Sequence, residues 1–318
     1  MDARQVTIFG GAGFLGRHTV RALAKAGWRI RVACRHPNRA LFLRPMGHVG
    51  QIDAVKCDIT EPDQVRAALA GSDAAVNLVG LLYGAFEEAH VVGAETVAKE
   101  AAAAGLKALV QVSAIGADVD SHSAYAMTKG EGENRVRAAF PAATILRPSI
   151  IFGPDDGFFN KFAAMARFLP FLPLIGGGKT RFQPVFVGDV AAAIVAALEN
   201  ESPRGKVYEL GGPTIYSFRE LMQITLATIH RRRALVPVPF LIAKVKAFFL
   251  QLAPRPILTP DQVELLKTDN VVAPGASGLA DLGIAPTTVE AEVASYLWRY
   301  RPKGEFADLN AVNPQASK

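Results

Sequence analysis

The sequence predicts an α/β protein: a doubly wound parallel sheet with a smaller, mixed and mainly helical carboxyl-terminal subdomain. Two observations predict it. Up to residue 153, short apolar runs alternate with helix-like stretches. Strands and helices that alternate at this spacing pair into a parallel sheet with helices on both faces. After residue 153 the alternation stops, and the chain becomes rich in Pro, Gly and Phe.

The apolar runs of the first half are predicted as strands and the stretches between them as helices. The strands are 5–9, 29–33, 53–57, 74–79, 107–112 and 143–147, and the helices are 14–26, 62–70, 86–104 and 124–139. Gly27, Gly71 and Gly105 each follow a helical run, where a left-handed cap is expected. Thr60 and Asp63 have the spacing of a capping box at the second helix, and Pro62 suits its first turn.

The second half is predicted as a subdomain interrupted by one return to the sheet domain. Residues 154–184 predict loops and short helices rather than regular sheet. Later segments predict helices at 189–199, 219–230, 239–252 and 260–267 and a strand at 206–210. We therefore assign 1–153 and 183–200 to the sheet domain, and 154–182 and 201–304 to the subdomain. The polar tail 305–318 is expected to be disordered.

Composition excludes several classes of protein. The 318 residues are 50% hydrophobic and 20% charged, which excludes wholesale disorder. A net charge of +6 favours an anionic partner, but the charges are too few and too scattered to indicate nucleic-acid binding. Cys34 and Cys57 are expected to be buried, reduced thiols. No cluster of ligands near them indicates a metal site.

Targeting and membrane-spanning segments are not expected. The first apolar run, 6–9, leads directly into a glycine-rich turn and leaves no room for a signal peptide. No run reaches the roughly 18 uncharged apolar residues that a membrane span needs. We expect a cytoplasmic protein, or one attached peripherally to the inner face of the inner membrane.

The spacing of Gly10, Gly13 and Gly16 predicts a dinucleotide site. They lie between the first strand and the first helix, where the backbone must turn sharply and approach a pyrophosphate. The helix N-terminus offers free N–H groups to the phosphates. The sheet domain is therefore predicted to be of the Rossmann type, with further cofactor contacts from the start of the helix at Phe14, Leu15 and Arg17.

The end of the second strand predicts NADP(H) in preference to NAD(H). An NAD site usually has Asp or Glu there to hold the ribose 2′-hydroxyl. This chain has Arg35, followed by Arg39, and Arg17 is close to the glycine turn. A guanidinium suits a 2′-phosphate and would leave a bare hydroxyl without an acceptor.

Further cofactor contacts are predicted along the same edge of the sheet. Asp58 ends the third strand, where a carboxylate can accept from the adenine amino group or cap the following helix, and Ile59 lies beside it. The middle of the cofactor would cross the end of the fourth strand at Asn77, Val79 and Gly80. We add Pro148, at the end of the sixth strand, to this set.

Ser113, Tyr125 and Lys129 form a catalytic-type constellation. Tyr125 and Lys129, at i and i+4, share one helix face, and Ser113 ends the fifth strand. A nearby ammonium lowers the pKa of a phenol and makes it a usable proton donor or acceptor. Lys129 can also hydrogen-bond the nicotinamide ribose, and Ser113 can orient a substrate carbonyl.

At these residues the chain resembles the short-chain dehydrogenase/reductase (SDR) superfamily. Residues 147–154 and 186–191 resemble motifs of its extended and atypical branches. The resemblance implies that Tyr125 is the acid/base, Lys129 its partner and Ser113 the orienting hydroxyl. Sugar-nucleotide enzymes of the superfamily usually have Asn and Tyr at Ile150 and Phe152, and the dehydratases have a Thr followed by an acid at Ser113. These departures argue against sugar-nucleotide chemistry.

A narrower resemblance is to the SDR-like accessory subunit of respiratory complex I and its bacterial relatives. Residues 113–118, 145–154 and 173–185 are similar to that group. The resemblance implies a tightly held NADPH with a mainly structural role near the quinone end of a membrane complex. A sister group is linked to ubiquinone biosynthesis, which leaves open an NADPH-dependent oxidoreductase or isomerase that acts on an apolar, quinone-like or isoprenoid-like substrate.

Residues 240–252 predict an amphipathic helix. Leu241, Ile242, Val245, Phe248, Phe249 and Leu252 fall on one arc, and three arginines, 231–233, precede the segment. An apolar stripe with basic flanks is typical of a helix at a membrane interface, but it also suits a helix packed on a core. Both alternatives stay open at this stage.

Overall fold

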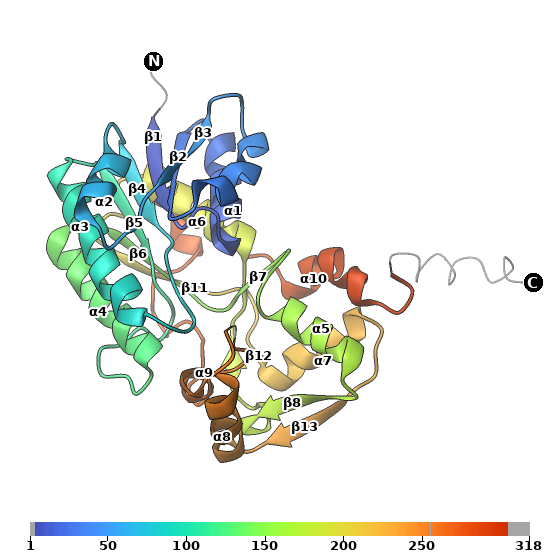
Figure 1. Cartoon of the computed structure of the whole chain (residues 1–318). Helices are drawn as coiled ribbons and strands as arrows, with labels where there is room; N and C mark the ends of the chain where they lie inside the picture. Colours follow the sequence, from blue (N-terminus) through green and yellow to red (C-terminus); the bar gives the residue numbers. More distant parts are fainter. Residues whose placement is uncertain (1–3, 255, 305–318) are drawn as a thin grey trace, which may run out of the picture. The chain divides into compact units, whose positions relative to one another are not determined.

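The computed structural model describes residues 4–254 and 256–304, and these divide into two compact units (Figure 1). The described residues of the first unit are 4–149, 187–211 and 272–286. Those of the second are 150–186, 212–254, 256–271 and 287–304. Residues 201–211 and 272–286, which we assigned to the subdomain, group with the sheet because they supply its last strand and the segment bonded to it. The expected tail at 305–318 lies outside the described residues.

The first unit is built on a parallel sheet, as the sequence predicts, but the sheet has seven strands, because the strand at 207–210, which we assigned to the subdomain, joins the six predicted ones. The strand order is β11-β6-β5-β4-β1-β2-β3, so the order reverses between β1 and β4. The strands are β1 (Gln5–Phe9), β2 (Arg29–Cys34), β3 (Ile52–Lys56), β4 (Ala74–Asn77), β5 (Ala108–Val112), β6 (Thr144–Pro148) and β11 (Val207–Leu210).

Helices cover both faces of this sheet (Figure 1). One layer holds α2 (Pro62–Leu69), α3 (Gly93–Ala103) and α4 (Ala124–Ala139), and the other holds α1 (Phe14–Lys25) and α6 (Val187–Glu199). The unit also contains the 3-10 segments η1 (Pro37–Met46) and η4 (Ala280–Leu282). The helix predicted at 86–104 begins with a π-helical segment, η2 (Glu87–Val92).

The caps of these helices agree with the sequence in part. Gly27, Gly71 and Gly105 have φ values of 82°, 72° and 67°, the left-handed conformation that was expected. The capping box at Thr60 is wrong: the N-cap of α2 is Glu61, and the Thr60 hydroxyl donates to Asp58 instead. Pro62 does occupy the first turn, where its missing N–H costs nothing.

The second unit combines helices with short two-stranded ribbons. Its helices are α5 (Phe159–Phe168), α7 (Phe218–Thr228), α8 (Phe240–Leu250), α9 (Pro260–Leu265) and α10 (Val289–Leu297), with 3-10 turns η3 (Gly176–Gly178) and η5 (Trp298–Tyr300). Its strands are β7 (Ile151–Phe152), β8 (Phe171–Ile175), β9 (Arg181–Phe182), β10 (Val185–Phe186), β12 (Tyr216–Ser217) and β13 (Ala234–Val238).

The parallel ribbon of β8 and β13 corrects the expectation that residues 154–184 lack regular sheet. Both strands contain a proline, Pro173 and Pro237, and the pairing runs from Ala234 with Phe171 to Val238 with Ile175. Proline removes a ladder donor, so it weakens a strand prediction, but in a two-stranded ribbon each strand is an edge, where proline is tolerated.

The core of the second unit is aromatic. Phe158 makes ring contacts with Phe159, Phe162, Phe182 and Phe218 at centroid distances of 5.2 to 6.2 Å. The contact with Phe182 is tilted and the other three are edge-on, and edge-on contacts add to the free energy that burial of the rings supplies. The Phe-rich composition of this part of the chain therefore serves its core.

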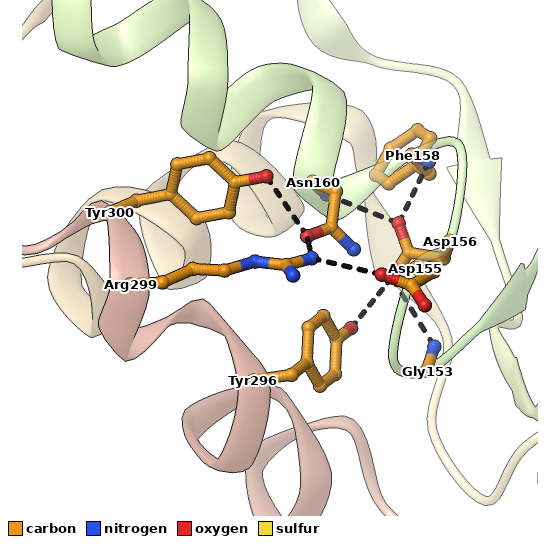
Figure 2. A network of polar contacts seen from close by, with 8 residues as sticks. All are labelled: Gly153, Asp155, Asp156, Phe158, Asn160, Tyr296, Arg299 and Tyr300. Atoms are coloured by element: carbon orange, nitrogen blue, oxygen red, sulfur yellow. Dashed lines mark hydrogen bonds and ion pairs between the residues drawn. The ribbon is translucent and has the colours of Figure 1, made fainter.

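A buried carboxylate connects the start of α5 to α10 (Figure 2). Asp156 Oδ1 accepts from the backbone N–H groups of Phe158 and Asn160, at 2.9 and 3.1 Å. Its Oδ2 accepts from the Gly153 N–H at 3.2 Å and from the Tyr296 hydroxyl at 2.7 Å. Burial raises the pKa of Asp156, and these four donors act in the opposite direction.

A second layer of contacts extends this network along the same helix end (Figure 2). The side-chain oxygen of Asn160, Oδ1, accepts from the Arg299 guanidinium and from the Tyr300 hydroxyl, and Arg299 also pairs with Asp155 at 3.4 Å. The chain after α10 is therefore held to the α5 N-terminus by polar contacts.

The residues described, 4–254 and 256–304, include no helix that is both long enough and apolar enough to cross a membrane.

Replacement of Tyr296 by Phe is expected to destabilise the protein, and more so at neutral than at acidic pH. The hydroxyl donates to an ionised, buried carboxylate, a bond worth about 1.5–3 kcal/mol. Below the raised pKa of Asp156 the carboxyl is neutral and the bond weaker, so the loss of unfolding free energy is smaller. Urea unfolding at pH 7 and at acidic pH measures both values.

Tyr216→Phe is the matched control, because its hydroxyl donates at 2.8 Å to Glu290 in an exposed contact. Its loss is expected to stay below about 0.5 kcal/mol. Equal losses from the two variants would contradict the role assigned to Asp156.

Candidate cofactor-binding site

The site predicted from the sequence lies at the point where the strand order of the sheet reverses. β1 pairs with β2 on one side and with β4 on the other, in parallel register. The loops that follow β1 and β4 therefore diverge at the carboxyl edge of the sheet. Ligands of open α/β sheets bind in the crevice that such a reversal creates.

The glycine turn leaves no space for side chains. Gly10 has φ 81°, and a Cβ there would lie 3.2 Å from the Leu78 carbonyl carbon. A Cβ on Gly16 would lie 2.5 Å from the Gly10 oxygen, so α1 can start this close to the turn only with glycine. The Gly13 N–H donates to the Gly10 oxygen at 3.0 Å, and α1 begins at Phe14, followed by Leu15.

The basic residues predicted to select the cofactor lie next to this turn. The Gly10 N–H donates to the Ala33 carbonyl at 3.4 Å, which places the end of β2 beside the turn, and Arg35 follows two residues later, exposed. The Arg17 guanidinium lies 5.3 Å from the ring centre of Phe42 in η1, the segment that follows β2. Arg39 is exposed on the same segment.

Asp58 and Ile59 lie after β3, at the same edge. Asp58 Oδ1 accepts from the Thr60 N–H and hydroxyl at 3.1 and 2.9 Å. The Thr60 N–H, and to a lesser extent the Arg35 charge, lowers the pKa of Asp58. Ile59 packs against Gly93 at the start of α3, where a Cβ would overlap it. The carboxylate is thus ionised and held in a turn.

The Asn77 side chain is engaged inside the protein. Its Nδ2 donates to Gln111 at 2.9 Å, and its Oδ1 accepts from the Val79 N–H at 3.1 Å. Gln111 in turn donates to the Val112 carbonyl at 3.2 Å. Asn77 therefore fixes the shape of the loop after β4, and its two amide atoms are occupied by the chain itself.

Ser113 presents a buried hydroxyl at the end of β5. Its backbone N–H donates to Leu146 of β6 at 2.7 Å, but its Oγ has no hydrogen-bond partner in the described part of the chain. Nearby, the Ile115 N–H donates to the Pro148 carbonyl at 3.0 Å, so Pro148 lies beside the loop after Ser113. A buried hydroxyl without a partner is costly, which makes Ser113 a candidate ligand contact.

Lys129 is buried against the same loops. Its Nζ donates to the Val112 carbonyl at 3.4 Å, directly before Ser113. A Cβ on Gly80 would lie 3.1 Å from this Nζ, so the loop after β4 approaches the ammonium closely at a glycine. Burial lowers the pKa of Lys129 to about 8, although the Glu133 charge acts to raise it.

The Tyr125 ring, one turn earlier on α4, lies among aromatic side chains that sequence reasoning missed. It makes edge-on contacts with Phe86 and with His90, at centroid distances of 6.0 and 5.4 Å. Phe86 and His90 stack on each other at 5.4 Å. These rings hold the tyrosine in place on the face of α4 that carries Lys129.

His90 is neutral, and its tautomer follows from its partners. Burial, and then the Lys129 charge, lowers the pKa of His90 to about 3. Nε2 accepts from the Leu81 N–H at 2.9 Å, so Nδ1 carries the proton and donates to Thr128 Oγ1 at 3.0 Å. The Thr128 hydroxyl donates onward to the Ala124 carbonyl at 2.7 Å. The imidazole thereby connects the loop after β4 to α4.

An ion pair that the sequence did not reveal positions α4. Glu133, one turn beyond Lys129, is buried and accepts two hydrogen bonds from Arg147 of β6, at 2.9 and 2.7 Å. Arg147 lies in a motif that resembles the SDR family, but no pattern in the sequence indicated that Glu133 is its partner. The only clue was its i+8 spacing from Tyr125 on one helix face.

Two further observations concern metals and thiols. In residues 4–254 and 256–304, no group of three or more His, Cys, Asp or Glu side chains is placed to hold a metal ion. Cys34 and Cys57 are free thiols, the first partly buried and the second buried. Burial raises the pKa of Cys57 to about 11, so this thiol stays protonated.

The site fits a dinucleotide on two grounds. The glycine turn forms a cradle that a Cβ would fill, and the Ser113 hydroxyl and Lys129 ammonium are buried at the end of β5. Of the residues predicted from sequence, the structure brings Ser113, Lys129, Gly80 and Pro148 together around β5. It gathers Gly10, Gly16, Val79 and the end of β2 around the glycine turn.

Comparison with known proteins agrees with this geometry. The profile of the NAD dependent epimerase/dehydratase family matches residues 6–211. The chain is 39% identical over 316 residues to NADH dehydrogenase (ubiquinone) 1 alpha subcomplex subunit 9, mitochondrial, of Arabidopsis thaliana, covering 94% of this chain and 78% of that protein. It is 36% identical over 200 residues to ceramide reductase of Caulobacter vibrioides, covering 61% of each chain.

Solved structures show the same fold. Triphenylmethane reductase of Citrobacter sp. matches with a TM-score of 0.75 at 21% sequence identity, over 92% of this chain and 99% of that one. The chain belongs to the NAD dependent epimerase/dehydratase family of SDR proteins, in the group that includes alpha subcomplex subunit 9 of complex I.

Proposed function

We propose that the chain binds NADP(H) and serves mainly as a structural or assembly component of a quinone-linked membrane complex, respiratory complex I or a related assembly. NADP(H) binding is supported by the glycine turn and by Arg35, which stands at the end of β2 where an NAD site has an acid. Association with a membrane complex is supported by the similarity to alpha subcomplex subunit 9. Its location would be peripheral, on the inner face of the inner membrane.

Each part of the cofactor has candidate partners. The backbone from Gly10 to Gly16 and the α1 N-terminus suit the pyrophosphate. Arg35 and Arg17 suit a 2′-phosphate, because a guanidinium can donate two hydrogen bonds to it. The remaining contacts that we propose are Phe14 and Leu15 beside the turn, Asp58 and Ile59 at the adenine, the loop Asn77, Val79 and Gly80 along the middle, and Tyr125, Lys129 and Pro148 at the nicotinamide end.

An alternative is an NADPH-dependent oxidoreductase or isomerase that acts on an apolar, quinone-like or isoprenoid-like substrate, for example in ubiquinone biosynthesis. The unpartnered Ser113 hydroxyl favours it, because a purely structural site does not need one. The similarity to a ceramide reductase, whose named substrate is a lipid, points the same way. The NADPH cofactor would supply the hydride.

In that case the chain's own residues would divide the remaining work. Ser113 would donate a hydrogen bond to a substrate carbonyl, and Tyr125 would give or take the proton. The Lys129 ammonium would hold the nicotinamide ribose and stabilise negative charge at the phenol. His90 and Phe86 would keep the tyrosine ring fixed.

Arg35→Asp is expected to reverse the cofactor preference. The wild-type protein should bind NADPH more tightly than NADH, because a guanidinium suits a 2′-phosphate. The carboxylate of the variant would repel that phosphate and accept from a 2′-hydroxyl, so NADPH affinity should fall at least tenfold, about 1.4 kcal/mol. Isothermal titration with both cofactors measures the change.

Arg29→Asp is the control for this experiment, because Arg29 is exposed at the opposite end of the same strand. It makes the same charge change and should leave the preference intact. If Arg35→Asp kept the wild-type preference for NADPH over NADH, Arg35 would not contact the cofactor.

Tyr125→Phe separates the two functions. The variant keeps the ring contacts with Phe86 and His90 and loses only the hydroxyl. A structural component should still restore the wild-type phenotype to a strain that lacks the gene, with NADH:ubiquinone activity of its membranes within about twofold. An enzyme should fail to do so, and failure by a stably folded variant would favour the alternative.

Purification of a tagged protein from gently solubilised membranes tests the partner. Complex I subunits should co-purify with the wild-type chain, since an accessory subunit is retained by its interface. They should also co-purify with Tyr125→Phe. Recovery of the chain alone, at an abundance where other subunits are detectable, would argue against the accessory role.

A further inference from the structure

The apolar face of α8 is directed away from the core of the second unit. Only Ala243 and Ala247 of this helix are buried, and they pack with Ile175 and with Val263 of α9. The large side chains are exposed, with Leu241 and Leu252 each 76% and Phe249 66% exposed. We call this set the α8 surface; its members are Leu241, Ile242, Val245, Phe248, Phe249 and Leu252.

This arrangement decides between the two interpretations of the sequence. A helix packed on a core buries its large apolar residues and exposes its polar ones. Here two alanines form the inward stripe, and all six members of the α8 surface are exposed. Figure 1 shows α8 following β13 and lying beside α9. A contiguous exposed apolar surface of this kind marks an interaction site.

The segments that precede and form this surface are rich in Lys and Arg, whereas the neighbouring helix α9 carries Asp261 and Glu264. Residues 221–260 contain six Lys and Arg and no Asp or Glu, and residues 157–186 contain four and none. Lys244 pairs with Glu264 at 3.4 Å, but that carboxylate also pairs with Lys267, so the group keeps a positive charge. Lys246 is exposed on α8 itself.

Two of the arginines before β13 donate to backbone carbonyl groups. Arg231 donates to the Tyr300 carbonyl at 3.0 Å and Arg233 to the Ala166 carbonyl at 2.9 Å. Partial burial, and then the charges of Arg233 and Arg167, lowers the pKa of Arg231. These cations lie close enough to one another to interact, so an anionic partner would relieve their repulsion.

We propose that the α8 surface inserts into the interface of a lipid bilayer that contains anionic lipids, with α8 lying in the membrane plane. Leu241, Phe248 and Phe249 supply apolar area to the boundary between headgroups and acyl chains. Lys244 and Lys246 reach the headgroups with their ammonium groups. The arginines near β13 add long-range attraction to the anionic surface.

A bilayer suits this surface better than a second copy of the chain. In a symmetric dimer the same patch would meet itself, and the exposed Lys244 and Lys246 of the two copies would face each other. Such a contact places like charges together and is unfavourable. A membrane with anionic headgroups supplies both the apolar layer and the opposite charge.

The inference deepens the proposed function, in that it names how the chain reaches a membrane, but its test does not use the complex or the cofactor. The purified full-length protein is floated with vesicles of phosphatidylcholine alone and with vesicles one third of which is phosphatidylglycerol. We expect it to float with the mixed vesicles, and binding to decrease as salt is raised. Failure to bind the mixed vesicles, or equal binding to both kinds, would overturn the proposal.

The double variant Phe248→Ser/Phe249→Ser should bind the mixed vesicles at least tenfold more weakly. Both side chains are exposed, so the fold should be unaffected, and an unchanged melting temperature and NADPH affinity verify this. Ile215→Ser is the matched control: Ile215 is an exposed apolar residue of the same unit outside the α8 surface, and its variant should bind like the wild type.

If the stably folded double variant bound vesicles as strongly as the wild type, the proposed insertion of the α8 surface would be contradicted. The proposal would also be contradicted if the wild-type protein did not bind vesicles and light scattering showed that it forms a dimer, which the double variant disrupts. A chain that floats with vesicles yet fails to titrate NADPH would instead refute the proposed function and leave this inference standing.

Discussion

The close packing of α4 against the rest of the first unit is the constraint on which the candidate site depends. A Cβ on Gly132 would lie 2.0 Å from the His90 carbonyl oxygen, and one on Gly130 would lie 2.7 Å from the Val119 nitrogen, so glycine is required at both positions. Glu133, on the same helix, is fixed by Arg147. Because Tyr125 and Lys129 occupy the same face as Glu133, the helix position sets where the phenol and the ammonium lie.

Burial then determines the chemistry of these groups. Lys129 is almost fully enclosed, with a pKa near 8, so it stays largely protonated at neutral pH but holds its proton less tightly than a surface lysine. His90 beside it is neutral and bonds through both ring nitrogens. The protein therefore places the Lys129 ammonium against the Val112 carbonyl, directly before Ser113 in the chain.

How far the sequence predicted this arrangement depends on how local each signal was. The glycine turn, the strand ends and the Tyr125–Lys129 pair were predicted because each is encoded within a few residues. His90, Glu133 and the β8–β13 ribbon were missed because their partners are distant in the chain, and Pro173 and Pro237 weakened the strand signal. For α8 the periodicity predicted an apolar face. Whether that face packs on the core or is exposed depends on the neighbouring elements, which the periodicity does not reveal. The alanines at 243 and 247, which make the inward contact, are too small to dominate the pattern.

The way the chain alternates between its two compact units has a consequence for biosynthesis. Each unit is assembled from three separate stretches, and the first is completed only by 187–211 and 272–286. The edge strand β11 leaves the ribosome after the first stretch of the second unit, 150–186, and the segment bonded to Glu209 through Ala273 follows only after the second stretch, 212–271. The edge of β6 that pairs with β11 therefore stays unpaired until β11 has been synthesised. Truncated chains that stop before residue 207 should expose it, which makes early termination products candidates for chaperone capture or aggregation.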